Sequence, residues 1–425
     1  MRDRELTIIT AGWVAPMDRP AYRDGAVVIG NGRIIDAGDA RDVSKAHRGA
    51  DAIDLPRAIL LPGLVNAHTH LELSACRAGD SPGAHFGEWI LGIRKQLAAQ
   101  GDDFAAVVSR AVREGVRQSL RFGVTTIGDV SQQNHIARHV LRGLPIRCVS
   151  YGETLGLAKQ RTRHAELLER ALDETHQSDR LRIGLTPHAP YTVELTDYRT
   201  CLHIARERGL PLATHLAENA QERDFLEHQT GLFREIWESL GMWADPVETY
   251  RGSPIAFAHA IGLLDYPTLL AHVNYCDDDE LDLLGRGRTS VVYCPRTHAY
   301  FGHPPHRWRE MLARGVNVAV GTDSCASSPD LNLVDDLRLL RKIAPEAPAQ
   351  ALWDMATVRA ARAIRMEDEV GTIARGKRSD LVAFEIDGPD PLESILLDAR
   401  GPAHVWFDGS LTPSEPASPA PSSRG

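Results

Sequence analysis

Histidines and acidic residues stand directly after several short apolar runs of this sequence. The first case is His68 and His70, two residues apart at the end of the run 60–70. Side chains two residues apart on a strand point to the same side, so both imidazoles could bind one metal ion. A His-X-His pair by itself is a weak signal, because histidine also fills ordinary core and surface positions. Its meaning therefore depends on the other runs.

Three other apolar runs end with residues of the same kinds. His215 ends one, with Glu218 three residues later, and His272 and Asp323 end the other two. Each could be an ordinary buried polar residue, but their joint occurrence favours one shared site. Three histidines with one aspartate suit Zn²⁺ or Fe²⁺ and leave positions open for water and substrate. Such an ion lowers the pKa of bound water from about 15.7 toward about 7, and Glu218 is placed to carry the proton.

The runs that precede these residues are typical of strands in a parallel sheet. They alternate with longer amphipathic segments such as 104–122, which predicts repeated β-α units. Eight strands separated by helices predict an α/β fold, a (β/α)8 TIM barrel, with catalytic groups at the carboxyl ends of the strands. A doubly wound sheet is the alternative, but no G-x-G-x-x-G turn follows the first run. The eight runs are 60–70, 123–130, 146–153, 181–190, 210–218, 269–275, 290–298 and 317–324.

Short β-branched segments and turns flank the barrel region on both sides. Asn31-Gly32 is a strong hairpin signal on the N-terminal side, and the helical pattern 352–365 is expected to close the barrel. Both ends of the chain should pair into one small β-structure, because chain ends often meet. We therefore expect a composite β-sandwich from 1–62 with 371–410, a barrel from 63–370 and a disordered Pro/Ser/Ala-rich tail from 411–425.

Composition narrows the class of protein. The 425 residues carry 48 Lys and Arg against 57 Asp and Glu, a net charge of −9, which argues against a nucleic-acid partner. No run of about 18 apolar residues occurs, so no membrane segment is expected. Six cysteines are widely spread without a C-x-x-C pair, which predicts reduced thiols and a cytoplasmic protein.

Several motifs, in this order, resemble those of the amidohydrolase superfamily. They are PGLVNAHTHLELS, THLAE, AHVNY, CPRTH and GTDS, and the later segment GTIARGKRSDLVAFE resembles the end of its flanking β-sandwich. Within the superfamily they resemble the branch of chlorohydrolases and aminohydrolases that act on purines, pyrimidines and triazines. Binuclear members carry a carboxylated lysine at the end of the fourth strand, whereas 181–190 contains no lysine. The resemblance therefore implies one divalent metal, Zn²⁺ first and Fe²⁺ second.

The resemblance also implies a role for each motif residue. Glu218 matches the glutamate that moves a proton to a ring nitrogen of the substrate. His272 matches the histidine that, together with Asp323, orients the hydroxide, so it counts as catalytic and not as a ligand. The positions that match metal ligands are His68, His70, His215 and Asp323.

Five further residues are candidates for substrate binding. The segment TPHAPYT resembles the substrate-binding loop of adenosine-type deaminases, in which His188 would contact the substrate. Trp89 could stack on a base or fill the core, and Glu153 could bind a ribose hydroxyl. Arg296 could bind a carboxylate or phosphate, or be a surface arginine. Arg296 and His298 follow the Cys-Pro of the seventh predicted strand, where related deaminases often have Ser-Asn.

The predicted reaction is hydrolysis of a carbon–nitrogen bond other than a peptide bond. CPRTHAYFGH and GTDSCASSPDLNLVDDL resemble the group of S-adenosylhomocysteine and aminodeoxyfutalosine deaminases, which implies a 5′-modified adenosine attacked by metal-activated hydroxide. The alternatives are dechlorination or deamination of a triazine, opening of a cyclic amide such as an imidazolone, or a scaffold without activity. The partner is then a small heteroaromatic molecule, and a homo-oligomer is possible for this branch.

Overall fold

Eight parallel strands form the centre of the molecule. The computed structural model describes residues 6–79, 86–99, 101, 103–248 and 250–413. The strands follow one another around the sheet in chain order, and a bridge between Thr69 and Asp323 brings the last strand beside the first. The predicted (β/α)8 barrel is confirmed. Its strands are β5 (Leu64–Thr69), β6 (Val124–Ser131), β7 (Arg147–Thr154), β8 (Leu181–Pro187), β9 (Leu212–Leu216), β10 (Thr268–His272), β11 (Ser290–Tyr293) and β12 (Asn317–Val320).

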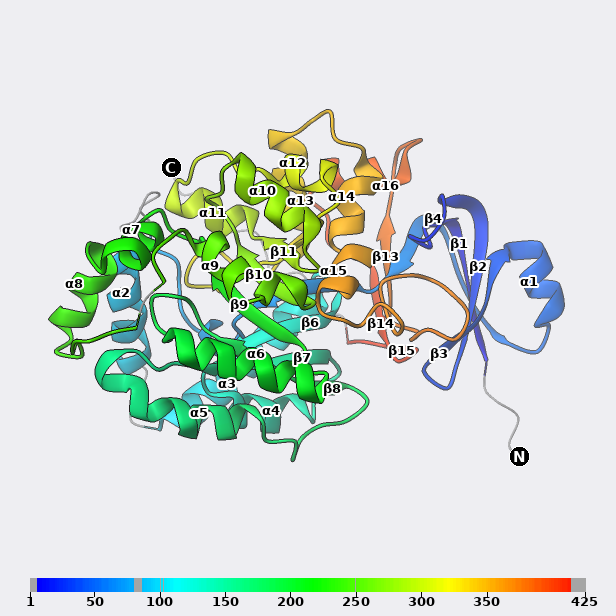
Figure 1. Cartoon of the computed structure of the whole chain (residues 1–425). Helices are drawn as coiled ribbons and strands as arrows, with labels where there is room; N and C mark the ends of the chain where they lie inside the picture. The colour runs from blue at the N-terminus through cyan, green and yellow to red at the C-terminus, as the bar shows by residue number, and fades with distance from the viewer. Residues whose placement is uncertain (1–5, 80–85, 100, 102, 249, 414–425) are drawn as a thin grey trace, which may run out of the picture.

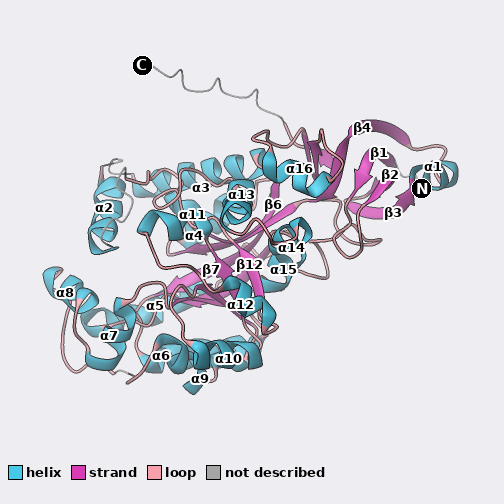
Figure 2. Cartoon of the chain, turned by 90° about the horizontal axis from the view of Figure 1, so that it is seen from above, coloured by secondary structure: helices cyan, strands magenta, loops and turns pink. Residues whose placement is uncertain are grey.

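Helices surround this sheet, as the view from above shows (Figure 2). The longest is α3 (Phe104–Arg121), which begins where the Asp103 carboxylate accepts the N–H of Ala106 and buries one valine-rich face. The others up to the last barrel strand are α2 (Phe86–Ala98), α4 (Asn134–Leu141), α5 (His164–Ala171), α6 (Leu195–Arg208), α7 (Gln221–His228), α8 (Leu232–Ser239), α9 (Pro254–Ala260), α10 (Asp278–Arg286), α11 (Pro295–Phe301) and α12 (Trp308–Ala313). Three 3₁₀ turns, η1 (Leu71–Leu73), η2 (Ala158–Arg163) and η3 (Leu263–Asp265), lie in the connections.

Both ends of the chain build a second, mixed sheet of seven strands beside the barrel. Figure 1 shows the blue N-terminal strands next to the orange strands β13 and β14. Asn31 and Gly32 have φ of 53° and 70°, so the expected hairpin turn joins β2 to β3. In sheet order the strands are β15 (Ser410–Leu411), β14 (His404–Phe407), β13 (Leu381–Glu385), β4 (Asp51–Pro62), β1 (Thr7–Val14), β2 (Tyr22–Gly30) and β3 (Arg33–Asp39), and α1 (Ala40–Ala46) follows β3.

The helical pattern 352–365 forms two helices and not one. They are α14 (Ala349–Met355) and α15 (Val358–Ala363), preceded by α13 (Leu333–Ile343) and followed later by α16 (Pro391–Leu397). The chain turns at Thr357, whose hydroxyl donates to the Trp353 carbonyl while its backbone leaves the helical region. The break lets the small residues of α15 pack against β5 and β12, where Ala360 and Ala361 are fully buried in the barrel core.

Two further predictions concern the C-terminal tail from residue 411 and the absence of a membrane-spanning segment. Leu411, the first residue of the predicted tail, lies in β15, and the Thr412 N–H donates to the Val405 carbonyl. Residues 414–425 lie outside the described part of the chain. Among the helices of the described part, none combines the length and apolar character needed to span a bilayer.

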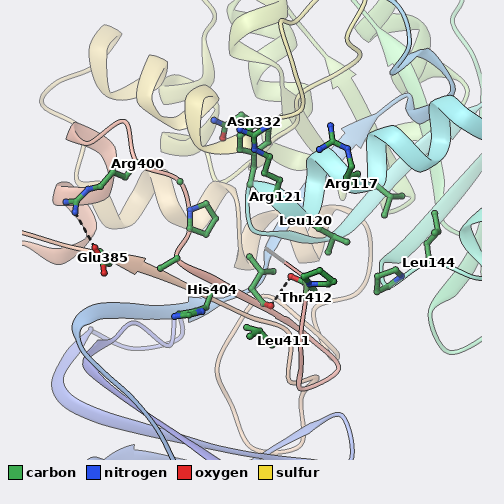
Figure 3. A pocket seen from close by; sticks show the side chains of 18 of the residues that line it. Arg117, Leu120, Arg121, Leu144, Asn332, Glu385, Arg400, His404, Leu411 and Thr412 are labelled. Carbon is green, nitrogen blue, oxygen red and sulfur yellow. Dashed lines mark hydrogen bonds and ion pairs between the residues drawn. The ribbon is translucent and has the colours of Figure 1, made fainter. Parts of the chain in front are cut away.

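A cavity of about 800 Å³ lies at the amino ends of the barrel strands, beside the mixed sheet (Figure 3). Arg117 and Arg121 of α3 line one wall, and Leu120, Leu144 and Leu411 contribute apolar surface. On the same side of the barrel, the buried Arg147 guanidinium pairs with Asp380 and Asp408 of the mixed sheet. These contacts join the two sheets.

Candidate metal centre and proton-transfer residues

Three histidines meet at the carboxyl ends of the barrel strands. His68 lies in β5, His70 is the first residue after this strand, and His215 lies in β9. One ring nitrogen from each lies within 4.8 Å of the other two, and all three rings are largely buried. The parallel strands thus bring together side chains that are 145 residues apart in the sequence.

The Asp323 carboxylate lies beside the same histidines. Its Oδ1 is 3.6 Å from His70 Nε2 and 3.9 Å from His68 Nε2, and its Oδ2 accepts a hydrogen bond from the Ser327 hydroxyl at 2.8 Å. Burial raises the pKa of Asp323 to about 6. Three imidazoles and one carboxylate therefore lie side by side.

The protonation of these rings shows that the cluster suits a cation. Burial lowers the pKa of His70 to about 3 and that of His215 to about 4, so both rings are neutral near pH 7. His215 donates its Nδ1 proton to the His188 carbonyl, and His70 hydrogen-bonds the backbone of Val130. Their Nε2 atoms then face each other as lone pairs at 3.2 Å. Two facing lone pairs repel unless a cation lies between them, and ligand histidines typically use the other ring nitrogen in this way.

His68 gives independent support for the same conclusion. Its Nε2 is buried, and within the described part of the chain it has no hydrogen-bond partner. Burial also lowers its pKa, so the ring is neutral. An unpartnered buried nitrogen costs free energy unless it has a ligand. The residues present therefore fit a divalent metal held by His68, His70, His215 and Asp323.

Glu218 and His272 form a pair next to this cluster. Glu218 Oε1 lies 3.5 Å from His272 Nε2, and the His272 ring lies 5.4 Å from both the His68 and His215 rings. Burial, and then the nearby Asp323 carboxylate, raises the pKa of Glu218 well above its usual value. Burial lowers the pKa of His272, so this imidazole is neutral. A protonated carboxyl beside a neutral imidazole can both donate and accept protons.

The backbone at these positions adopts conformations that L-residues usually avoid. Ala217, His272, Val273 and Asp323 have φ between 50° and 72°. Such conformations persist where the surrounding structure imposes them, and they concentrate at functional sites. Gly321 adds a close approach, because a Cβ there would lie 2.7 Å from the His68 carbonyl oxygen. The strand ends are thus shaped to aim particular side chains.

His188 lies beside the histidine cluster, and Trp89 contacts the loop that follows Asp323. The His188 ring lies 4.8 Å from the His215 ring, and its Nδ1 is 2.7 Å from the Thr192 hydroxyl. Trp89 Nε1 donates to the carbonyl of Ala326, three residues beyond Asp323. The Trp89 ring packs edge-on against Phe301 at 5.2 Å, so it is both anchored and half-buried.

Glu153 is the next-to-last residue of β7, also at the carboxyl end of the barrel. Its side chain is almost fully buried, and burial together with the neighbouring Glu72 raises its pKa to about 8. Glu72 itself accepts hydrogen bonds from the Ser131 hydroxyl and from the N–H of Gln133. Glu153 is therefore positioned as a protonated hydrogen-bonding group.

Arg296 and His298 are bound to the protein itself. The Arg296 guanidinium donates to the carboxylates of Asp336 and Asp330 and to the Asp330 carbonyl. A substrate anion would have to displace these acceptors, so the geometry favours Arg296 as a brace for the loop after β12. His298 Nε2 hydrogen-bonds the Pro304 carbonyl at 2.8 Å. These tertiary contacts were not evident from the sequence.

Sequence reasoning missed three residues that support the site. Glu222 accepts backbone N–H groups from the loop that carries Glu218, and His306 Nε2 donates to the His272 carbonyl at 2.9 Å. Ser327 donates to Asp323. Spacing offered one signal, because Glu222 and Ser327 each stand four residues after the residue they support.

A family model identifies the chain. The model of the amidohydrolase family matches residues 59–412, which is most of the sequence. This chain belongs to the amidohydrolase family. The predicted superfamily is confirmed, and this amidohydrolase has a histidine cluster typical of a metal site at the carboxyl ends of the barrel strands.

Individual proteins resemble this amidohydrolase over most of its length. A 5-methylthioadenosine/S-adenosylhomocysteine deaminase of Nitratidesulfovibrio vulgaris is 29% identical over 402 residues, covering 90% of this chain and 84% of the relative. The structure of Helicobacter pylori aminofutalosine deaminase in complex with methylthio-coformycin superposes with a TM-score of 0.83 at 22% identity, covering 96% of this chain and all of that one. Atrazine chlorohydrolase of Arthrobacter aurescens, complexed with zinc, gives a TM-score of 0.80 at 21% identity, with 95% and 94% covered.

Proposed function

We propose that this amidohydrolase deaminates an adenine-type nucleoside by hydrolysis, with a 5′-modified adenosine as the substrate class. The observation that carries the proposal is the Glu218–His272 pair directly beside the histidine cluster, where burial raises the pKa of Glu218 well above its usual value. The names of the relatives support the same class, since one is a methylthioadenosine and S-adenosylhomocysteine deaminase. Deamination exchanges the exocyclic amino group for a water-derived oxygen and releases ammonia.

Glu218 has the proton that this reaction needs first. In its protonated form it donates to the ring nitrogen adjacent to the amine-bearing carbon, which makes that carbon electrophilic. The Glu218 carboxylate that results can accept a proton from the added oxygen and return it to the amino group. The carbon–nitrogen bond then breaks, and ammonia leaves.

His272 and Asp323 accept the proton that the attacking water loses. The neutral His272 imidazole and the Asp323 carboxylate lie on the cluster side of Glu218, where both can accept that proton. A divalent metal, when bound, makes hydroxide available near neutral pH by lowering the pKa of water. We propose Zn²⁺, because the donors are of the borderline type that zinc prefers and because the related chlorohydrolase is complexed with zinc.

Substrate contacts complete the proposal. We propose that His188, beside the His215 ring, and Trp89, bonded to the Ala326 carbonyl, contact the base, and that Glu153 hydrogen-bonds a ribose hydroxyl. The partner is a small heteroaromatic molecule, and a homo-oligomer remains part of the proposal. All six cysteines are free thiols, which suits the reducing cytoplasm in which we place the enzyme.

Ammonia release by the purified, zinc-loaded enzyme tests this function. The panel holds adenosine, methylthioadenosine, S-adenosylhomocysteine, aminodeoxyfutalosine, guanine, cytosine and a chlorotriazine. We expect release from a 5′-modified adenosine, loss of activity on chelation, and at least about a thousandfold loss of kcat in Glu218→Gln. Glu280→Gln is the matched control, since Glu280 is equally buried but lies in the capping box of α10.

A second candidate function follows from the chlorohydrolase similarity. Turnover of the chlorotriazine with chloride release, and none of the adenosines, would replace the proposed substrate class and leave the family assignment intact. No release from any compound by an enzyme with one zinc per chain would count against both. Cyclic amides would then be the next class to test.

A further inference from the structure

The carboxylate of Glu222 accepts hydrogen bonds from three consecutive backbone N–H groups. Oε2 accepts from Ala217 at 2.9 Å, and Oε1 accepts from Glu218 at 2.6 Å and from Asn219 at 3.0 Å. Glu222 lies in the first turn of α7 and has no exposed surface. The loop after β9 is therefore wrapped around a single buried carboxylate.

This loop is the one that carries Glu218. Ala217 holds a φ of 51°, a conformation that alanine adopts only when neighbouring contacts impose it. On its other side the loop is bonded to the segment after His272. The Val273 N–H donates to the Leu216 carbonyl, and the Asn274 side chain donates to the Glu218 carbonyl at 3.0 Å. Glu222 and that segment hold the loop from two sides.

Only a carboxylate satisfies all three donors. An amide in its place would offer one acceptor oxygen, and its NH₂ group would face at least one N–H. Hydrogen bonds from N–H groups to a charged oxygen are also stronger than neutral ones. Burial raises the pKa of Glu222 itself to about 7, and its three backbone N–H bonds only partly offset that rise. In its charged form Glu222 raises the pKa of Glu218, after the larger effects of burial and Asp323.

We propose that Glu222 is a positioning residue for proton transfer, which fixes the backbone from which the Glu218 side chain reaches the substrate. It acts through the loop and not on the substrate. The inference rests on the proposed function, in which Glu218 carries the proton. It extends that function to a residue one helical turn further along the chain.

The test compares Glu222→Gln with Glu280→Gln in the full-length, zinc-loaded enzyme. Glu280 is a close match, because its buried carboxylate also accepts a backbone N–H, that of Asp277 at 2.8 Å. We expect kcat per bound zinc to fall about ten- to a hundredfold in Glu222→Gln. KM should stay within about threefold, because ground-state binding is not the interaction removed. Glu280→Gln should retain wild-type kcat.

Amide hydrogen exchange gives a measurement that does not depend on activity. In Glu222→Gln, exchange in a peptide covering 213–222 should rise, while the other barrel strands keep their protection. Unchanged exchange together with wild-type kcat, or a rise in KM at constant kcat, would overturn the proposal. If Glu222→Gln melts as a whole, Glu222→Asp serves instead, since it keeps the charge but is one methylene too short to reach all three donors.

The two proposals can fail separately. If the wild-type enzyme released no ammonia from any compound of the panel, this would count against the deaminase function. The hydrogen-exchange measurement would still decide whether Glu222 holds the loop. An active wild type with an equally active Glu222→Gln would overturn the positioning role alone.

Discussion

The two ends of the barrel contrast in what they bury. At the carboxyl end the strands bury imidazoles and carboxyls, several on backbone with positive φ, and His68 Nε2 has no partner among the described residues. At the amino end, α15 fills the space with small apolar side chains, and Arg147 has its charge neutralised by Asp380 and Asp408. At the carboxyl end the buried polar groups converge on one point, whereas the amino end is filled mainly by apolar side chains and by the ion pairs of Arg147.

The carboxyl end of the barrel is thus built for function, and the amino end for stability. Unsatisfied buried groups destabilise the protein, so several ligand-type groups that converge on one point indicate a place that a ligand or a reaction uses. The cavity beside the mixed sheet shows that volume alone does not indicate a catalytic site. It is large, but its wall presents surface arginines and apolar groups and not a converging set of metal ligands.

The largest effect should come from Asp323→Asn at the carboxyl end. The substitution removes a charged donor and a proton acceptor while preserving shape, so kcat should fall by at least about a thousandfold. Ammonia release and zinc content per chain are the measurements, with thermal melting as the check on folding. Activity retained by the zinc-loaded variant would show that the Asp323 carboxylate has no part in the reaction.

Gly321→Ala should have the next largest effect. Its new Cβ would meet the His68 carbonyl oxygen at 2.7 Å and the His68 Cβ at 2.9 Å, so either His68 or the backbone at position 321 must shift. We expect about a ten- to hundredfold loss of kcat/KM and destabilisation of about 1–3 kcal/mol. Zinc affinity and denaturant unfolding measure the two effects.

The matched control for this substitution lies at the other end of the barrel. Gly401→Ala adds the same methyl group beside the cavity, where its Cβ would meet nothing within 4 Å. It should be neutral in both measurements. A loss as large as that of Gly321→Ala would mean that the two ends are equally sensitive to packing.

The buried Asp129 side chain should make the free energy of unfolding depend on pH. Burial raises its pKa from 3.8 to about 8, and Oδ2 has no hydrogen-bond partner in the described structure. The folded protein therefore keeps a proton that the unfolded chain releases, so its stabilising contribution is lost as pH rises between those values. Asp129→Asn should remove that loss, on the order of 1–4 kcal/mol by pH 8. Unfolding free energies at pH 5 and pH 8 measure it, and equal slopes for variant and wild type would contradict it.

The smallest effect should come from Arg121→Ala in the cavity wall. Arg121 stacks over Phe122 at 5.5 Å, so its removal should cost at most about 1 kcal/mol of stability. Steady-state kcat and KM should stay at wild-type values. A clear change in either would mean that the cavity communicates with the carboxyl end, and the comparison of the two ends would need revision.

Much of the fold was predictable because its signals are local. Each barrel strand is a short apolar run between amphipathic helices, and each candidate ligand stands at a strand end, as His68 and Asp323 illustrate. The hairpin at Asn31-Gly32 depends on two adjacent residues that tolerate positive φ. By contrast, the break at Thr357 was not predicted, because helical periodicity continues through it and only packing under the barrel requires the turn.

The sequence by itself determined the barrel and the residue types that could bind a metal, because strand periodicity and chain order place those residues at one end of a parallel sheet. Only the tertiary structure decided how the other polar residues are used. Arg296 is paired with Asp330 and Asp336, and Glu222 holds the loop of Glu218. Such roles depend on which partners the fold brings within hydrogen-bonding distance. The four-residue spacing between Glu218 and Glu222 is a local signal, but it does not by itself show that three N–H groups converge on one carboxylate.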